Sequence, residues 1–148
     1  MKRKCLVLTI CILLIGCDSG YEGEIEKVDP STIEPLEITS EDIVDTHGDI
    51  TNLERLNDFL SNIETHQSDQ VRIISYTEEG APVLKNISFS EDLFTFTHDT
   101  RRDGFGTQIV ETFTCEGMIK DETQSSIRYS LDGCTGDEEM IMVLESHS

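Results

Sequence analysis

The chain has 148 residues, of which 30 are acidic and 11 basic, and a formal net charge of −19 at pH 7. An acidic chain lacks the basic surface that displaces counterions from nucleic acid, so nucleic acid is excluded as a partner. The length and a hydrophobic content of 36% suffice for one modest core.

The N-terminus has the pattern of a secretory signal. Residues 2–4 are Lys, Arg and Lys, and residues 5–15 are apolar except for Thr9. This run is shorter than the about 20 apolar residues of a membrane-spanning helix. We therefore predict a signal peptide over residues 1–16.

The signal ends in Leu14-Ile15-Gly16-Cys17, which resembles the lipobox of bacterial lipoproteins. The resemblance implies that the Cys17 sulfur receives a diacylglycerol and that cleavage makes Cys17 the first mature residue. It also implies a lipid-anchored protein on the extracellular face of the cell membrane. The open alternative is a plain signal peptide with a chance cysteine.

The charge of the mature chain bears on how it would be anchored. Residues 1–16 contain three basic and no acidic residues, so removing them leaves a formal charge of −22. Anionic lipid would repel such a chain, so the lipid on Cys17 has to act alone. Two acyl chains, at about 0.8 kcal/mol per buried CH₂, anchor a protein stably in a membrane, whereas one chain binds only weakly.

Residues 17–41 form the next segment, which we predict to be an acidic flexible tether. It is rich in Asp, Glu, Ser, Thr and Gly, and Pro30 and Pro35 oppose regular structure. A flexible coil of this length spans roughly 25–30 Å. The folded domain is therefore expected over residues 42–148.

An amphipathic helix is predicted over residues 52–65. Thr51 and Glu54 have the spacing of a capping box. The apolar residues then recur at helical spacing and form one face. These are Leu53, Leu56, Phe59, Leu60 and Ile63.

Short stretches of alternating apolar and polar residues, separated by turn residues, follow the helix. They predict strands over residues 71–77, 83–90, 93–99, 107–115, 127–131 and 140–144. The expected fold class is α+β, with one N-terminal amphipathic helix packed on a mainly antiparallel sheet of five or six strands.

Two cysteines remain after Cys17, namely Cys115 and Cys134. In an exported chain an even pair favours a disulfide, worth about 3 kcal/mol for a loop of this size. Metal binding by the pair is the weaker alternative, because there is no CxxC spacing and no nearby His. A free nucleophilic cysteine is weaker still.

Three stretches carry a resemblance to a family: residues 46–53 (THGDITNL), 71–82 (VRIISYTEEGAP) and 98–106 (HDTRRDGFG). The chain resembles the small lipoproteins of Bacillus-type bacteria that carry a domain of unknown function, over about residues 43–134. The resemblance includes both Cys115 and Cys134 and implies no catalytic residues.

One group of polar residues is the candidate binding cluster, because side chains of neighbouring strands converge on a sheet face. Its members are Arg72, Tyr76, Glu79, His98, Asp99, Arg101, Arg102 and Asp103. A His beside a carboxylate suits acid–base chemistry, so a small hydrolase using His98 with Asp99 or Asp103 is one alternative. The competing interpretation is that these residues are solvated or stabilise a turn.

A second alternative is an acidic ion-binding envelope protein, in which Asp99, Asp103 and residues 137–139 (DEE) bind Ca²⁺. No calcium-loop spacing is present, and the four histidines are scattered. We therefore predict no metal site and no cofactor. The favoured hypothesis is a non-enzymatic, lipid-anchored module that binds an envelope protein or ligand, because no catalytic motif is found.

Overall fold

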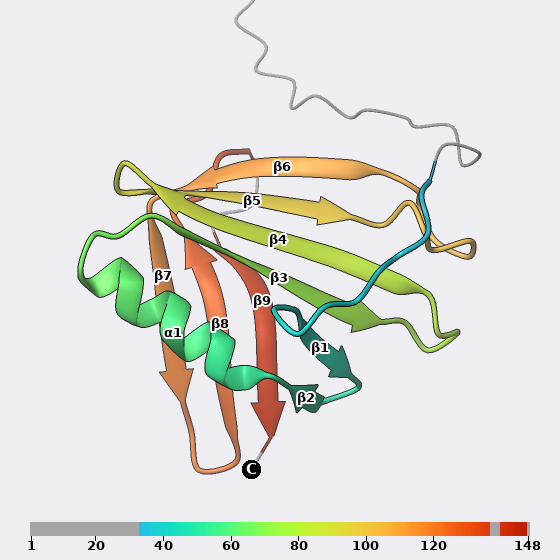
Figure 1. Cartoon of the computed structure of the whole chain (residues 1–148), viewed down its shortest axis with the longest axis horizontal. Helices are drawn as coiled ribbons and strands as arrows, with labels where there is room; N and C mark the ends of the chain where they lie inside the picture. Colours follow the sequence, from blue (N-terminus) through green and yellow to red (C-terminus); the bar gives the residue numbers. More distant parts are fainter. Residues whose placement is uncertain (1–32, 137–139, 148) are drawn as a thin grey trace, which may run out of the picture.

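The computed structural model describes residues 33–136 and 140–147 (Figure 1). The described chain is mostly β, with nine strands and one helix. In order these are β1 (Ile43–Thr46), β2 (Asp49–Thr51), α1 (Leu53–Glu64), β3 (Asp69–Tyr76), β4 (Pro82–Ser90), β5 (Leu93–Asp99), β6 (Val110–Cys115), β7 (Gly117–Glu122), β8 (Ser126–Asp132) and β9 (Met140–His147).

The predicted α+β fold, with an N-terminal helix on a single sheet, is wrong. The strands form a six-stranded sheet in the order β2-β1-β3-β4-β5-β6 and a three-stranded sheet in the order β7-β8-β9. The helix is not the first element, because β1 and β2 precede it. These two strands have four and three residues, too few for a period-2 pattern to stand out.

A tight hairpin joins β1 to β2. His47 and Gly48 have φ values of 55° and 92°, the backbone that a two-residue hairpin turn requires. The Asp45 carboxylate accepts a hydrogen bond from the Gly48 N–H at 2.8 Å, which fixes the turn. The sequence pattern predicts no strand in this segment.

The helix connects β1 and β2 to β3, which pairs with β1 in parallel. A parallel pair needs a crossover of this kind. The predicted capping box is also wrong, because Asn52 is the N-cap and makes no capping bond. Instead Asn52 has φ 59° and its side-chain amide donates to the Ser40 and Asp42 carbonyls.

The core lies between the two sheets and α1. One face of the six-stranded sheet contributes alternating apolar residues, as period-2 burial requires. Leu56 and Phe59 of α1 and residues of β8 and β9 pack against that face. In Figure 1 the strands of the smaller sheet cross those of the larger one steeply, with α1 beside them. The core residues of the larger sheet are Ile43, Val71, Ile73, Ile87, Phe89, Phe94, Phe96 and Cys115.

A disulfide ties the two sheets together. Glu116 alone separates β6 from β7, where the chain passes from one sheet to the other. Cys115, at the end of β6, is bonded to Cys134, in the loop after β8, with an S–S distance of 2.09 Å. The Thr135 N–H also donates to the Thr114 carbonyl at 2.8 Å, so this loop lies against β6.

The predictions for the N-terminus lie outside the described residues. These are the signal peptide over 1–16, lipidation of Cys17 and residues 17–32 of the tether. Within residues 33–136 and 140–147, no helix has the length and apolar character needed to cross a membrane.

Candidate functional site

The second face of the six-stranded sheet, here called the open face, carries rows of residues in register. One row is Gln70, Ser88, Thr95 and Thr114, and the next is Arg72, Asn86, Thr97 and Thr112. Both rows are polar and carry hydroxyl, amide or guanidinium groups. The third row is Ile74, Leu84, Asp99 and Val110, and its first three members are 0%, 6% and 5% exposed.

A segment of residues 33–42, here called the strap, is held on the open face. Arg72 Nη2 donates to the Glu37 carbonyl at 2.9 Å, and Arg102 Nη2 donates to the Glu34 carbonyl at 3.0 Å. In Figure 1 the blue segment passes the ends of β3, β4 and β5. These two hydrogen bonds join the strap to β3 and to the loop after β5.

The strap ends in a bidentate ion pair. Arg72 Nε and Nη2 lie 2.7 and 2.6 Å from the two carboxylate oxygens of Asp42. The hydrogen bond from Arg72 lowers the pKa of Asp42, and hydrogen bonds from the Thr39 backbone N–H and hydroxyl lower it further. Burial raises this pKa, but the hydrogen bonds outweigh it. The pKa of Arg72 is raised by the same bond. This pair fixes the strap to β3 immediately before β1.

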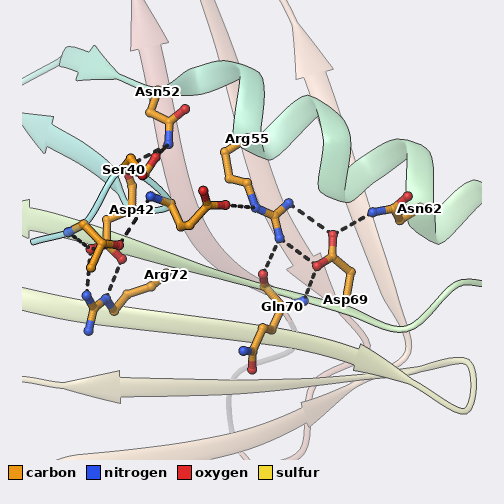
Figure 2. A network of polar contacts seen from close by, with 10 residues as sticks. Ser40, Asp42, Asn52, Arg55, Asn62, Asp69, Gln70 and Arg72 are labelled. Carbon is orange, nitrogen blue, oxygen red and sulfur yellow. Dashed lines mark hydrogen bonds and ion pairs between the residues drawn. The ribbon is translucent and has the colours of Figure 1, made fainter.

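A second bidentate pair lies between α1 and the start of β3 (Figure 2). Arg55 Nη1 and Nη2 lie 3.1 and 2.7 Å from the Asp69 oxygens, and both side chains are 16% exposed. Burial raises the pKa of Asp69, but hydrogen bonds from Arg55, Asn62 and the Gln70 N–H outweigh it and lower the pKa. Arg55 Nε also faces Glu41 of the strap at 3.9 Å.

A groove of about 530 Å³ lies where the strap, α1 and the open face meet. The two ion pairs form its border, and strands β3, β4 and β5 form its floor. Its lining residues are Glu41, Asp42, Arg55, Asp69, Gln70, Val71, Arg72, Asn86, Ile87, Ser88, Thr95 and Thr97. The volume is within the range of small-molecule sites, but most of those are apolar and this groove is polar.

Several groups in the groove have no hydrogen-bond partner within the described part of the chain. They are the side-chain amides of Gln70 and Asn86, the hydroxyls of Ser88 and Thr95, and Arg72 Nη1. Both carboxylates of the border, in contrast, are occupied by arginines. Apart from Arg72 Nη1, the floor is thus a surface of neutral donors and acceptors that are available to a ligand.

The predicted polar cluster does not form one cleft. Arg101 Nε and Nη2 lie 2.9 and 2.6 Å from the Asp99 oxygens, and Arg102 Nη1 lies 3.5 Å away. Burial raises the pKa of Asp99. The hydrogen bonds and charge of Arg101, with the charge of Arg102, outweigh this effect, so the pKa is lowered overall. Only Arg72 of the predicted residues lines the groove.

The other predicted residues are scattered. Tyr76 pairs with Pro82 at the end of β3, and Glu79 is exposed in the following turn. Asp103 accepts a hydrogen bond from the Phe105 N–H at 3.0 Å and so stabilises a turn.

His98 faces the core side of the sheet, whereas Asp99 faces the open side, because successive side chains of a strand alternate. His98 stacks on Phe96, and its Nδ1 lies 3.9 Å from Glu111. Burial, helped by Lys85, lowers the pKa of His98. The hydrolase alternative pairs His98 with Asp99 or Asp103. Asp99 lies on the opposite face of the sheet from His98 and is bonded to Arg101, and Asp103 accepts a hydrogen bond from the Phe105 N–H.

The calcium alternative gains no support from the described residues. Among them, no three His, Cys, Asp or Glu side chains come together as a metal site. The Asp99 carboxylate is occupied by arginines. Residues 137–139, the other proposed ligands, lie outside the described residues.

Sequence reasoning missed most of the groove. Asn86, Ser88, Thr95 and Thr97 occupy the polar positions of strands that were predicted, so their alternation with apolar residues was an available signal. The two ion pairs gave no such signal. Their partners are 14 and 30 residues apart and meet only through α1 and β1.

The fold and the groove define a small, mostly β domain with two packed sheets, one crossover helix and a polar open face. The chain belongs to the family described as a domain of unknown function, DUF4362, whose model matches residues 40–130. No curated protein and no solved structure matches the chain. The matched region contains the end of the strap, α1 and every strand of the groove.

Proposed function

We propose that this protein is a lipoprotein of the bacterial cell envelope, of the kind found in Bacillus-type bacteria, anchored outside the cell membrane through lipid on Cys17. The motivation is the lipobox-like Leu14-Ile15-Gly16-Cys17 after a charged and apolar start. Its domain acts as a non-enzymatic binding module, and the groove on the open face is the binding site.

The observation that carries the binding role is the set of neutral groups without a hydrogen-bond partner in the described residues, beside two bidentate ion pairs. Such a surface presents neutral hydrogen-bonding groups to a ligand and keeps its charged groups at the border. Its border is rigid, because bidentate Arg–carboxylate pairs fix both side chains. Pre-organised polar groups lower the cost of binding.

The groove lacks the parts of a hydrolytic site. Among the described residues, its lining includes no His and no Cys. Two of its three acidic residues, Asp42 and Asp69, accept arginine hydrogen bonds that lower their pKa values, so neither suits a general acid. The third, Glu41, is exposed at the rim. The role proposed for the groove is therefore binding.

The anchor is tested by replacing Cys17. Cys17→Ala should abolish incorporation of labelled palmitate and release the protein from membranes or leave it uncleaved. The control is Cys134→Ala, which should keep the label. A processed Cys17→Ala protein that stays on the membrane would refute the lipid anchor.

The binding site is tested with purified, insoluble cell-wall material and the full chain. Asn86 is exposed on the groove floor, and Asn86→Arg would place a long cationic side chain across it. We expect saturable co-sedimentation of the wild type and at least about ten-fold weaker retention of the variant, a change of about 1.4 kcal/mol.

The matched control is Gln124→Arg, which adds the same side chain at an exposed turn between β7 and β8. It should bind like the wild type. Equal retention of wild type, Asn86→Arg and Gln124→Arg would rule out the groove as the site. Melting temperatures of all three proteins should agree, because both positions are exposed.

A further inference from the structure

We infer that the groove recognises a neutral, amide-bearing sugar polymer, a chain of N-acetylated hexosamines. The inference rests on the proposed function, in which the groove is a binding site of the envelope. Three features support it: the neutral hydrogen-bonding groups on the groove floor, the charged groups that are already paired at its border, and the position of the groove on the sheet.

The groove floor offers donors and acceptors together. The amides of Gln70 and Asn86 each present a carbonyl oxygen and an NH₂ group, and the hydroxyls of Ser88 and Thr95 do either. A matching ligand must carry donors and acceptors at close spacing. Acetamido and hydroxyl groups on a sugar ring have this property, whereas an apolar ligand would leave the floor unsatisfied.

The charges of the border disfavour a polyanion. Asp42 and Asp69 keep their arginines occupied, so no guanidinium is fully available to an anionic polymer. Arg72 Nη1 is left to donate to a neutral oxygen. Glu41 adds an exposed negative charge at the rim, and the chain carries 30 acidic residues in all. A polyanionic wall polymer would be repelled from such a surface.

The position of the groove disfavours an extended peptide. Peptides that add to a sheet pair with an unpaired strand edge. Of the floor strands, β4 and β5 are hydrogen-bonded to neighbours on each side. Residues 69–72 of β3 pair with β4 and lie beyond the β1 pairing, and Arg55 Nη2 donates to the Gln70 carbonyl on that side. Val71 and Ile87, the apolar residues of the lining, belong to the buried core. The centre of the floor thus offers neither a free backbone edge nor an exposed apolar pocket for a peptide side chain.

Calorimetry on the full chain, purified from membranes in detergent, tests the inference. The probes are a β-1,4-linked hexamer of N-acetylglucosamine, the glucose hexamer with the same linkage, polyglutamate and an uncharged peptide. We expect saturable binding of the N-acetylated hexamer and at least about ten-fold weaker binding of the other three. Asn86→Arg should lose this binding and Gln124→Arg should keep it.

Equal or tighter binding of the glucose hexamer, the polyanion or the peptide overturns the inference. So does failure of every probe while Asn86→Arg still weakens retention by wall material, because the groove then binds a ligand of another class. If Asn86→Arg leaves wall retention unchanged as well, the proposed function itself fails.

Discussion

Arg72 and Asp42 are 30 residues apart and form a bidentate ion pair in which the Asp42 side chain is only 4% exposed. The pair closes one end of the groove and holds the strap on β3. Replacing the arginine would leave a buried carboxylate without its partner.

We therefore expect Arg72→Met to lower the free energy of unfolding by about 2–3 kcal/mol, since a buried charged group loses its hydrogen bonds. Denaturant titration of the full chain measures this. The control is Arg128→Met, which removes a partly exposed pair with Glu145 at 3.2 Å and should cost less than about 1 kcal/mol. Equal losses in the two variants would show that the Arg72 pair has no special role.

The N-terminal part of the strap should detach when its two arginine contacts are weakened together. Arg72→Lys with Arg102→Lys removes the guanidinium hydrogen bonds to the Glu37 and Glu34 carbonyls. A glutamate-specific protease should then cleave faster after Glu34 or Glu37. The rate should rise about ten-fold for each 1.4 kcal/mol by which the free energy of attaching the strap is reduced. Mass spectrometry of the fragments gives the site, and Arg128→Lys should cleave at the wild-type rate.

Acid should destabilise the fold through three carboxylates. Asp42, Asp69 and Asp99 have pKa values lowered from 3.8, so the unfolded chain binds more protons than the folded chain in this range. Their contribution is present above about pH 4 and is lost as the pH falls through the folded pKa values. Unfolding free energies measured between pH 5 and 2.5 should show the decline, and Asp69→Asn should make it shallower. A decline of unchanged slope in that variant would contradict the assignment for Asp69.

His98 adds a separate effect at higher pH. Its pKa is lowered from 6.5 by burial and by Lys85, against the opposing pull of Glu111 and Asp99. Protonation therefore favours the unfolded chain, and stability should fall as the pH drops below about 6.5. Thermal melts between pH 7.5 and 5 measure this dependence of stability on pH. His98→Gln should abolish it, whereas the control His47→Gln, which changes a histidine in an exposed turn, should keep it.

The Cys115–Cys134 bridge should be present in the purified protein. The intact chain is then two hydrogens lighter than its reduced form. Cys115→Ser with Cys134→Ser should lower the free energy of unfolding by about 3 kcal/mol. Mass spectrometry and denaturant titration measure the two quantities. Two free thiols in freshly purified protein would contradict the pairing.

Much of the local structure follows from the sequence pattern. The helix predicted over residues 52–65 is α1, and the strand predicted over residues 93–99 matches β5 to the residue. These segments have strong periodicity and clear turn residues at their ends. The strand over residues 107–115 begins three residues too early, because the glycine-containing loop before it carries no strong stop signal.

The arrangement of the sheets does not follow from local pattern. β7 was missed, because its last four residues are exposed and it carries little apolar alternation. The parallel pairing of β1 with β3 joins segments separated by a helix, and the division into two sheets depends on one linking residue, Glu116. Each of these features depends on contacts between segments far apart in the sequence, which form only when the core packs.

The strap also determines how the domain would respond to tension on the proposed membrane attachment. A force applied at residue 33 acts on the Arg102 and Arg72 contacts before it reaches the β1–β3 pairing. Loss of those contacts and of the Asn52 bonds to the Ser40 and Asp42 carbonyls would free ten residues. At full extension they would add about 33 Å of reach while both sheets stay folded. The same event would remove Glu41 and Asp42 from the groove wall. Tension on the proposed attachment would therefore release a bound ligand from the groove.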